Sequence, residues 1–446
     1  MFTILVRGRK DREAVRKAVN IFYPYWNIKI ETLGGVRSSK LSDVLVEKIK
    51  PFTLVLVGRR DLEYVKDAFS RKGLVAFTGY SLVDRSEVRN ARLEMISHSI
   101  DKGRAIIRAG LSFINSSYIF AFSENHGVLR NFHPEMDNFL VLSDSGATIA
   151  SEITGVLVKP PIIVYKYGEG IHEFYKCDKL IAVARFEMRN TRILEKIDSE
   201  VSCKENRDLL ASNQSIIKAM DLFFRQFLER NVNEQIEKIV IPWSGGKDST
   251  AVLIAATKLF GRNRVIALFS DTGVEFPETL EYIEKVASHL GINLHIEKAG
   301  LDEAIKHRGL PRLGDRWCTG LKLEALKRAM NKIARDYRNY VVIIGDRDAE
   351  SKIRVKRPPV RIEDGHVVLS PLKLFSGAQI ELYIMSKGIP LNPLYEKGFY
   401  RIGCYICPSL RHWELSIIEK ARLLSNVREN IFFNMFMKER MSEEDG

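Results

Sequence analysis

The spacing of apolar and polar positions divides the chain into regions of different character. At the start, short apolar runs alternate with stretches whose apolar residues recur at helical spacing. MFTILVRG, NIKIETLGG and FTLVLVGRRD predict strands, and DREAVRKAVNIFY and SDVLVEKIK predict the helices between them. This alternation predicts a small α/β domain over residues 1–115.

Two further changes of pattern follow along the chain. Over residues 116–190, short β-like runs such as NFLVLSDSG and PPIIVYKYGEG are separated by turn residues, which predicts a β-rich module. This module resembles a PUA-type RNA-binding domain, although its glycine pattern departs from that family, and a purely structural β domain is the alternative. Helical spacing over residues 205–232 predicts a helical linker, placed at 191–233, which leads into a third domain over 234–446.

Length and composition fit this division. A chain of 446 residues exceeds what one hydrophobic core organises, and each domain is long enough to bury its own core. Hydrophobic residues make up 45% and charged residues 28%, as in globular proteins. No apolar run approaches the roughly 18 to 20 residues of a membrane span, and the N-terminus does not have the charge order of a secretory signal. We therefore expect a cytoplasmic protein without a membrane partner.

Positive charge is concentrated near the N-terminus. The formal net charge is +13, and a basic surface attracts polyanions. In the first 60 residues the basic side chains outnumber the acidic ones. The basic side chains are Arg7, Arg9, Lys10, Arg12, Arg16, Lys17, Lys29, Arg37, Lys40, Lys48, Lys50, Arg59 and Arg60. This asymmetry indicates tRNA or another nucleic acid as a partner, and solvated helix faces are the alternative.

The strongest chemical signal lies between EKIVIPW, an apolar strand, and STAVLIAATKLF, a helix. The turn that joins them, SGGKDS at 244–249, stands at a helix N-terminus, where backbone N–H groups and the helix dipole favour an anion. Gly245 and Gly246 permit close approach of the backbone, Lys247 adds positive charge, and Ser244 and Ser249 add hydroxyl donors. These features predict a phosphate site.

The turn is not a Walker A loop, which needs GxxxxGK[ST]. It resembles the SGGxDS PP-loop of the ATP-pyrophosphatase superfamily, whose members bind ATP and cleave between its α and β phosphates. Asp248 separates it from a generic phosphate cradle, because a carboxylate there suits Mg²⁺ or an adenylation step. We accordingly predict catalytic roles for Lys247 and Asp248.

Later motifs extend the expected site. Asp271 and Thr272 end the strand IALFSDT, at the edge where doubly wound sheets bind ligands, and an ordinary turn cap is the alternative for Asp271. Arg347 and Arg354, in GDRDAESKIR after the strand YVVIIG, suit charge-assisted contacts with phosphate or sulfate. All four residues are expected to bind the nucleotide.

Together with SGGKDS, the segments DTGVEFPET, RWCTGLKLEAL, GDRDAESKIR and PLYEKGFYRIGCYICP resemble the phosphoadenosine phosphosulfate (PAPS) reductase family within that superfamily, over roughly residues 236–415. The resemblance implies an α/β fold whose C-terminal catalytic domain is a doubly wound parallel sheet, Rossmann-like and of the adenine nucleotide α-hydrolase type. It implies an adenine nucleotide as ligand, and the intact SGGKDS loop favours ATP with Mg²⁺ as that nucleotide.

Cysteine spacing suggests a metal centre. Cys404 and Cys407 form a CxxC and Cys318 lies in RWCTG, whereas Cys177 and Cys203 stand apart. Adenylyl-sulfate reductases of the family place cysteines at corresponding motifs around a [4Fe-4S] cluster, but Thr319 replaces the second cysteine of their CC pair. A three-cysteine [4Fe-4S] cluster, a Zn²⁺ site and a pair of inert cysteines are the three interpretations.

The expected reaction depends on a missing residue. Reductases of the family use a catalytic cysteine in a C-terminal tail, and this chain has no cysteine after Cys407. The intact loop also favours adenylation, so we expect an enzyme that adenylates an acceptor, such as tRNA, and then transfers sulfur from a donor that the sequence does not identify. A sulfonucleotide reductase that releases sulfite is the alternative, and a nucleotide-responsive nucleic-acid-binding protein without turnover is the second.

Overall fold

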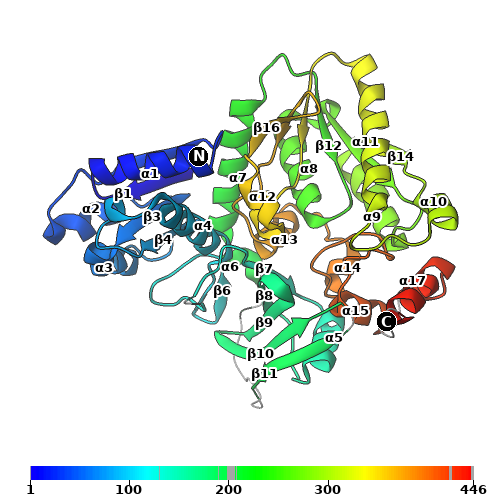
Figure 1. Cartoon of the computed structure of the whole chain (residues 1–446), viewed down its shortest axis with the longest axis horizontal. Helices are drawn as coiled ribbons and strands as arrows, with labels where there is room; N and C mark the ends of the chain where they lie inside the picture. The colour runs from blue at the N-terminus through cyan, green and yellow to red at the C-terminus, as the bar shows by residue number, and fades with distance from the viewer. Residues whose placement is uncertain are drawn as a thin grey trace.

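The computed structural model describes residues 2–129, 131–188, 190–197, 206, 208–420 and 424–442. Three large sheets and one two-stranded sheet organise these residues. Figure 1 shows the N-terminal sheet to one side, the C-terminal sheet to the other and the five-stranded antiparallel sheet below them. No helix in the described part of the chain is long and apolar enough to cross a membrane.

The N-terminal domain is a parallel sheet of order β2-β1-β3-β4. Its strands are β1 (Phe2–Val6), β2 (Ile28–Thr32), β3 (Thr53–Gly58) and β4 (Thr78–Val83), and its helices are α1 (Arg9–Phe22), α2 (Leu41–Lys48), α3 (Leu62–Lys72) and α4 (Leu93–Ala109). Strand β3 is buried along its whole length, as expected for an apolar run inside a parallel sheet.

The second region is a five-stranded antiparallel sheet of order β11-β10-β9-β8-β7, preceded by the hairpin β5 (Ser112–Ile114) and β6 (Ser117–Ile119). The sheet comprises β7 (Asp137–Val141), β8 (Ile162–Lys166), β9 (Ile171–Lys176), β10 (Lys179–Phe186) and β11 (Thr191–Lys196), with α5 (Asp144–Thr154) after β7. Residues 191–196 were expected to begin the helical linker, but they pair with β10 and form the edge strand. The linker helices are α6 (Leu209–Ser212) and α7 (Gln214–Asn231).

The C-terminal sheet has the order β14-β13-β12-β15-β17-β16, parallel except for the edge strand β16. The strands are β12 (Lys238–Pro242), β13 (Val265–Asp271), β14 (Asn293–Lys298), β15 (Tyr340–Ile343), β16 (Val360–Glu363) and β17 (His366–Leu369). The order runs outward in both directions from β12, so the predicted doubly wound α/β class is confirmed, with its switch point between β12 and β15.

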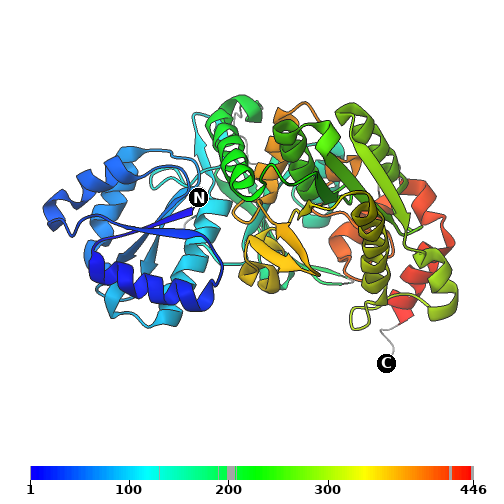
Figure 2. The same ribbon diagram turned by 90° about the horizontal axis from the view of Figure 1, so that it is seen from above.

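Helices surround this sheet and connect it to the rest of the molecule. They are α8 (Lys247–Phe260), α9 (Pro277–Leu290), α10 (Leu301–Arg308), α11 (Trp317–Asp336), α12 (Lys352–Lys356), α13 (Gly377–Ser386), α14 (Pro393–Glu396), α15 (His412–Lys420), α16 (Ser425–Arg428) and α17 (Ile431–Ser442). Viewed from above, α7 lies between the N-terminal and C-terminal sheets (Figure 2).

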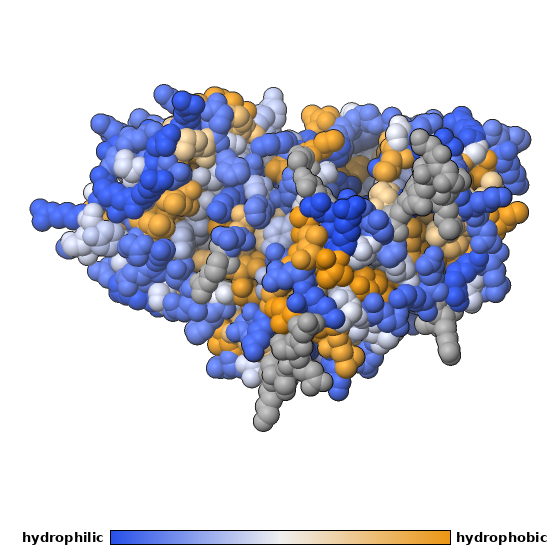
Figure 3. Space-filling view, turned by 60° about the horizontal axis from the view of Figure 1, so that its bottom comes forward, coloured by the Kyte–Doolittle hydropathy of each residue, from blue (hydrophilic) through white to orange (hydrophobic). Residues whose placement is uncertain are grey.

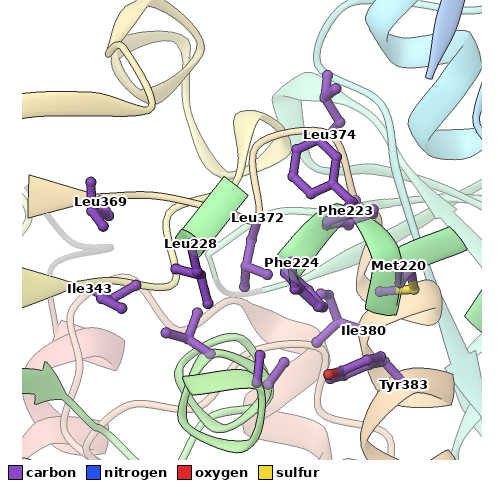
Figure 4. Close-up of a cluster of buried hydrophobic side chains, with 14 of the residues drawn as sticks. Met220, Phe223, Phe224, Leu228, Ile343, Leu369, Leu372, Leu374, Ile380 and Tyr383 are labelled. Carbon is purple, nitrogen blue, oxygen red and sulfur yellow. The ribbon is translucent and has the colours of Figure 1, made fainter. Parts of the chain in front are cut away.

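The three regions do not have separate cores. Phe52 of the N-terminal domain lies 4.6 Å from Phe223 of α7, ring centre to ring centre, and Phe77 lies 5.1 Å from Phe375 of the C-terminal domain. Figure 4 shows α7 side chains such as Phe224 meeting Leu372 and Tyr383. Shared apolar burial therefore fixes the domains against one another. Outside these cores, the face in Figure 3 is largely hydrophilic, with apolar residues in scattered patches.

Candidate active site

The PP-loop lies where the sequence places it, between β12 and α8. Gly245 has a φ of +70°, and a Cβ there would lie 2.9 Å from Thr279 Cγ2, so only glycine suits this turn. Gly246 caps α8, and Asp248 lies in the first turn of the helix. Trp243 Nε1 donates to Thr250 Oγ1 at 2.9 Å, which ties the end of the strand to the start of the helix.

A pocket of about 280 Å³ opens beside the loop at the switch point of the sheet. It combines loop residues with residues that follow β15 and with the segment before the CxxC; its lining is Pro242, Ser244, Gly246, Asp248, Ser249, Gly345, Asp346, Glu350, Arg354, Tyr395, Arg401 and Ile402. The sequence prediction missed Asp346, Glu350, Tyr395 and Arg401, although all four lie inside the motifs it quoted.

Gly345 permits the close contact between the segment that follows β15 and the PP-loop. A Cβ at this position would lie 2.7 Å from the Asp248 carbonyl carbon and 2.8 Å from Ser249 N. These are backbone atoms that cannot swing aside, so a side chain here would displace the loop.

Lys247 and Arg347 are engaged inside the protein. The Lys247 ammonium donates to the backbone oxygen of Tyr400 and lies 4.7 Å from the centre of the Tyr395 ring, and the residue is 2% exposed. Arg347 is 4% exposed; it donates from Nε to Asp248 Oδ1 at 2.6 Å and from Nη1 to Asp137 Oδ2 at 2.7 Å. Lys247 and Arg347 are thus placed to hold the loop, with the Arg347 charge balanced by two carboxylates.

Charges on the pocket wall are largely paired. Arg354 contacts Glu350 and lies 3.5 Å from Asp346 Oδ1, and Arg401 Nε lies 3.9 Å from Glu414 Oε1. Burial opposes charge on Arg354, but Glu350 and Asp346 outweigh it and raise its pKa. Arg354 lines the pocket, in the position expected for an anion contact, and is already paired with acidic groups.

Asp271 and Thr272 shape their own loop after β13. Asp271 Oδ1 accepts from Gly273 N at 2.9 Å, and Thr272 is buried and donates to Glu275 Oε1 at 2.8 Å. The residues that line the PP-loop pocket do not include either of them. The contact of Asp271 with Gly273 N is that of an ordinary turn cap, the alternative given for this residue in the sequence analysis.

Cys318, Cys404 and Cys407 lie around Lys322, beside the loop that follows β13. Cys404 is buried, and Lys322, one turn after Cys318 on α11, places Nζ 4.0 Å from Cys404 Sγ and 3.8 Å from Glu275 Oε1. Burial opposes the charge of Lys322, but the neighbouring thiols and Glu275 outweigh it and raise its pKa. Cys407 Sγ lies 3.6 Å from Nη2 of Arg401, a residue that lines the PP-loop pocket, so the cysteines adjoin that pocket.

As these side chains lie, the Lys322 ammonium is the positively charged group beside the Cys404 sulfur. Among the described residues, no group of three or more His, Cys, Asp or Glu side chains could hold a metal ion. The three-cysteine centre stays a prediction, which metal and sulfide analysis of anaerobically purified protein tests. Cys177 is disulfide-bonded, and Cys203 lies outside the described residues.

Comparison with known proteins gives the C-terminal domain a family. Residues 238–410 match the phosphoadenosine phosphosulfate reductase domain. Uncharacterized protein MJ0066 of Methanocaldococcus jannaschii is 33% identical over 197 residues, which are 43% of this chain and 40% of that protein. Phosphoadenosine 5'-phosphosulfate reductase of Proteus mirabilis is 28% identical over 142 residues, 30% of this chain and 57% of that protein.

Among solved structures, the PAPS reductase of Candida auris in complex with phosphate aligns with 44% of this chain and 97% of its own, at 21% identity and a TM-score of 0.33. The chain spans about half the length of the curated relatives it matches.

Proposed function

We propose that the phosphoadenosine phosphosulfate reductase domain at residues 238–410 binds ATP with Mg²⁺ in the PP-loop pocket and adenylates an acceptor for sulfur transfer. The observation that carries the proposal is the pocket itself, which joins the intact SGGKDS loop, at the N-terminus of α8, to carboxylates at the switch point of the sheet. A helix N-terminus favours phosphate, and carboxylates favour the metal that accompanies it.

Different residues of the pocket suit different parts of the proposed ligand. Ser244 and Ser249 place hydroxyl groups at the pocket wall, where they suit phosphate oxygens. Asp248 presents a side chain that is 20% exposed, and together with phosphate oxygens it fits Mg²⁺, which is held in proteins by one or two carboxylates plus substrate phosphates. When bound, Mg²⁺ offsets phosphate charge and stabilises the charge that develops at the α-phosphate.

The reaction itself is a substitution at phosphorus. An acceptor oxygen attacks the α-phosphorus, the new acceptor–phosphorus bond forms, and the bond to the bridging α–β oxygen breaks, so that pyrophosphate leaves with the bonding electrons. Tyr395 supports the loop during this step, because its hydroxyl accepts from Lys247 N at 2.9 Å. The adenylated acceptor is then the substrate for a sulfur donor.

We also propose tRNA as the acceptor class. The support is the exposed side of α1, which carries Arg9, Lys10, Arg16 and Lys17. Lysine and arginine side chains displayed on one helix suit a phosphate backbone. A nucleic acid held by this helix would show binding that weakens steeply with added salt.

The deciding assay measures pyrophosphate release from ATP with Mg²⁺, with and without unmodified tRNA. Acceptor-dependent release of pyrophosphate supports the proposal. Sulfite release from adenylyl sulfate or PAPS with a thiol reductant, without pyrophosphate release, would replace it with the reductase function. Unaltered ATP together with tight tRNA binding would replace it with a binding protein that has no turnover.

A further inference from the structure

A buried ionic chain joins the antiparallel sheet to the PP-loop. Asp137, the first residue of β7, accepts from Arg347 Nη1 at 2.7 Å and, through its other oxygen, from Gly377 N at 3.0 Å. Arg347 in turn donates to Asp248 Oδ1 at 2.6 Å. The side chains of Asp137 and Arg347 are 12% and 4% exposed, so this chain of contacts runs inside the protein.

Asp137 lies outside the region that matches the reductase domain, residues 238–410. Strand β7 contacts α13 at a second point besides the hydrogen bond from Gly377 N to Asp137. There, Glu381 Oε2 accepts from Leu140 N at 3.1 Å. The second region therefore supplies a charged group to the catalytic domain, from a position fixed by backbone hydrogen bonds.

Charge balance explains why two carboxylates face one guanidinium. If Arg347 paired with Asp248 alone, its full charge would offset the carboxylate that faces the nucleotide pocket. With Asp137 on the other side, the guanidinium is shared, and Asp248 keeps negative charge for a cation. A group that orients and tunes a metal ligand in this way commonly alters metal affinity 10- to 100-fold when it is replaced.

We propose that Asp137 is a positioning residue of the nucleotide site, which holds Arg347 and balances its charge so that Asp248 can bind the Mg²⁺ of ATP. This inference rests on the proposed function. It makes the antiparallel sheet a part of the active site, whatever else that sheet binds.

The test replaces Asp137 with its neutral isostere, Asp137→Asn, in the full chain. ATP binding is measured by titration calorimetry at a series of Mg²⁺ concentrations, without any acceptor. We expect the half-saturating Mg²⁺ concentration to rise about 10- to 100-fold, with ATP still binding at saturating Mg²⁺. A merely structural role would reduce the fraction of protein that binds and leave the half-saturating concentration unchanged.

Arg411→Ala is the matched control. Arg411 Nη1 donates to the backbone oxygen of Phe186 at 2.8 Å, so it also joins the antiparallel sheet to the C-terminal domain, but through strand β10. This variant is expected to lower the thermal midpoint without shifting the Mg²⁺ dependence. If Asp137→Asn yields no folded protein, Arg347→Lys serves, because a single ammonium keeps the charge but loses the fork that bridges both carboxylates.

The outcomes separate the two proposals. Wild-type binding of ATP that depends on Mg²⁺, with an unchanged half-saturating concentration in Asp137→Asn or, in its place, Arg347→Lys, overturns the role of Asp137 and leaves the proposed function standing. Failure of the wild-type protein to bind ATP at any Mg²⁺ concentration overturns the proposed function, and the role of Asp137 with it.

Discussion

Glu381 gives the sharpest test of the packing beside the PP-loop. The residue is 2% exposed on α13, and its carboxyl accepts from Leu140 N of β7. Burial raises its pKa to about 8; Lys247 and the Leu140 N–H act against this rise, whereas Asp137 and Asp248 add to it. The native protein therefore holds a proton at neutral pH that the unfolded chain has released.

The sign and size of the effect follow from this difference. The ordinary pKa is 4.5 and the native one about 8, so the stabilisation is fully present below about pH 4.5 and is lost as the pH rises towards 8. Each pH unit in that window costs up to about 1.4 kcal/mol of unfolding free energy. About 3.5 units, the difference between 8 and 4.5, give a total of about 5 kcal/mol.

Glu381→Gln removes the titrating group and keeps an oxygen that can accept from Leu140 N. We expect the unfolding free energy of the variant to exceed that of the wild type by an amount that grows with pH between about 5 and 8. Urea unfolding followed by tryptophan fluorescence measures it, with Glu152→Gln, at an exposed surface pair with Lys420, as a control that should track the wild type. Parallel pH profiles for Glu381→Gln and wild type would refute the reasoning.

Three further changes test other parts of the structure. Gly345→Ala places a Cβ against the PP-loop backbone and should weaken ATP binding at least about tenfold by calorimetry, whereas Gly314→Ala, with open space around it, should not. His172→Phe should flatten the loss of stability in acid, because burial lowers the His172 pKa from 6.5 to about 3 and protonation over that range favours the unfolded chain; an unchanged acid limb in urea unfolding would contradict this. Phe375→Ala should cost about 3–5 kcal/mol of unfolding free energy, since Phe375 is fully buried among Phe52, Phe77 and Phe223; a loss below about 1 kcal/mol would show that these rings do not join the domains.

Local signals made part of the fold predictable. SGGKDS follows an apolar strand and precedes a helix within one short stretch, and that order alone places the loop at the C-terminal edge of β12. Strand β11 was missed because TRILEK has mostly exposed residues, so its apolar pattern is weak, and its pairing with β10 is what defines it.

The role of Arg347 could not be predicted from the sequence around it. Its place after a strand at the nucleotide edge suits an anion contact, but its partner Asp137 lies 210 residues earlier in a different sheet. Nothing in the segment EMDNFLVLS distinguishes Asp137 from an ordinary residue at the start of a strand. The prediction of a separate core for each domain was wrong for the same reason. The Phe52 and Phe375 rings come into contact only when the domains pack together.

The paired charges in the pocket bear on which nucleotide it suits. Arg354 faces Glu350 and Asp346, and the Lys247 ammonium is bound to a backbone oxygen, so the cations near the loop already have partners. Asp248, Asp346 and Glu350 place three carboxylates on the pocket wall. Because the cations and the carboxylates of the pocket are paired with one another, they offset little of the charge of a triphosphate, and a divalent cation between phosphate and carboxylate would offset more of it. We therefore expect the pocket to favour a nucleotide that arrives with its own metal ion, as the proposed ATP with Mg²⁺ would.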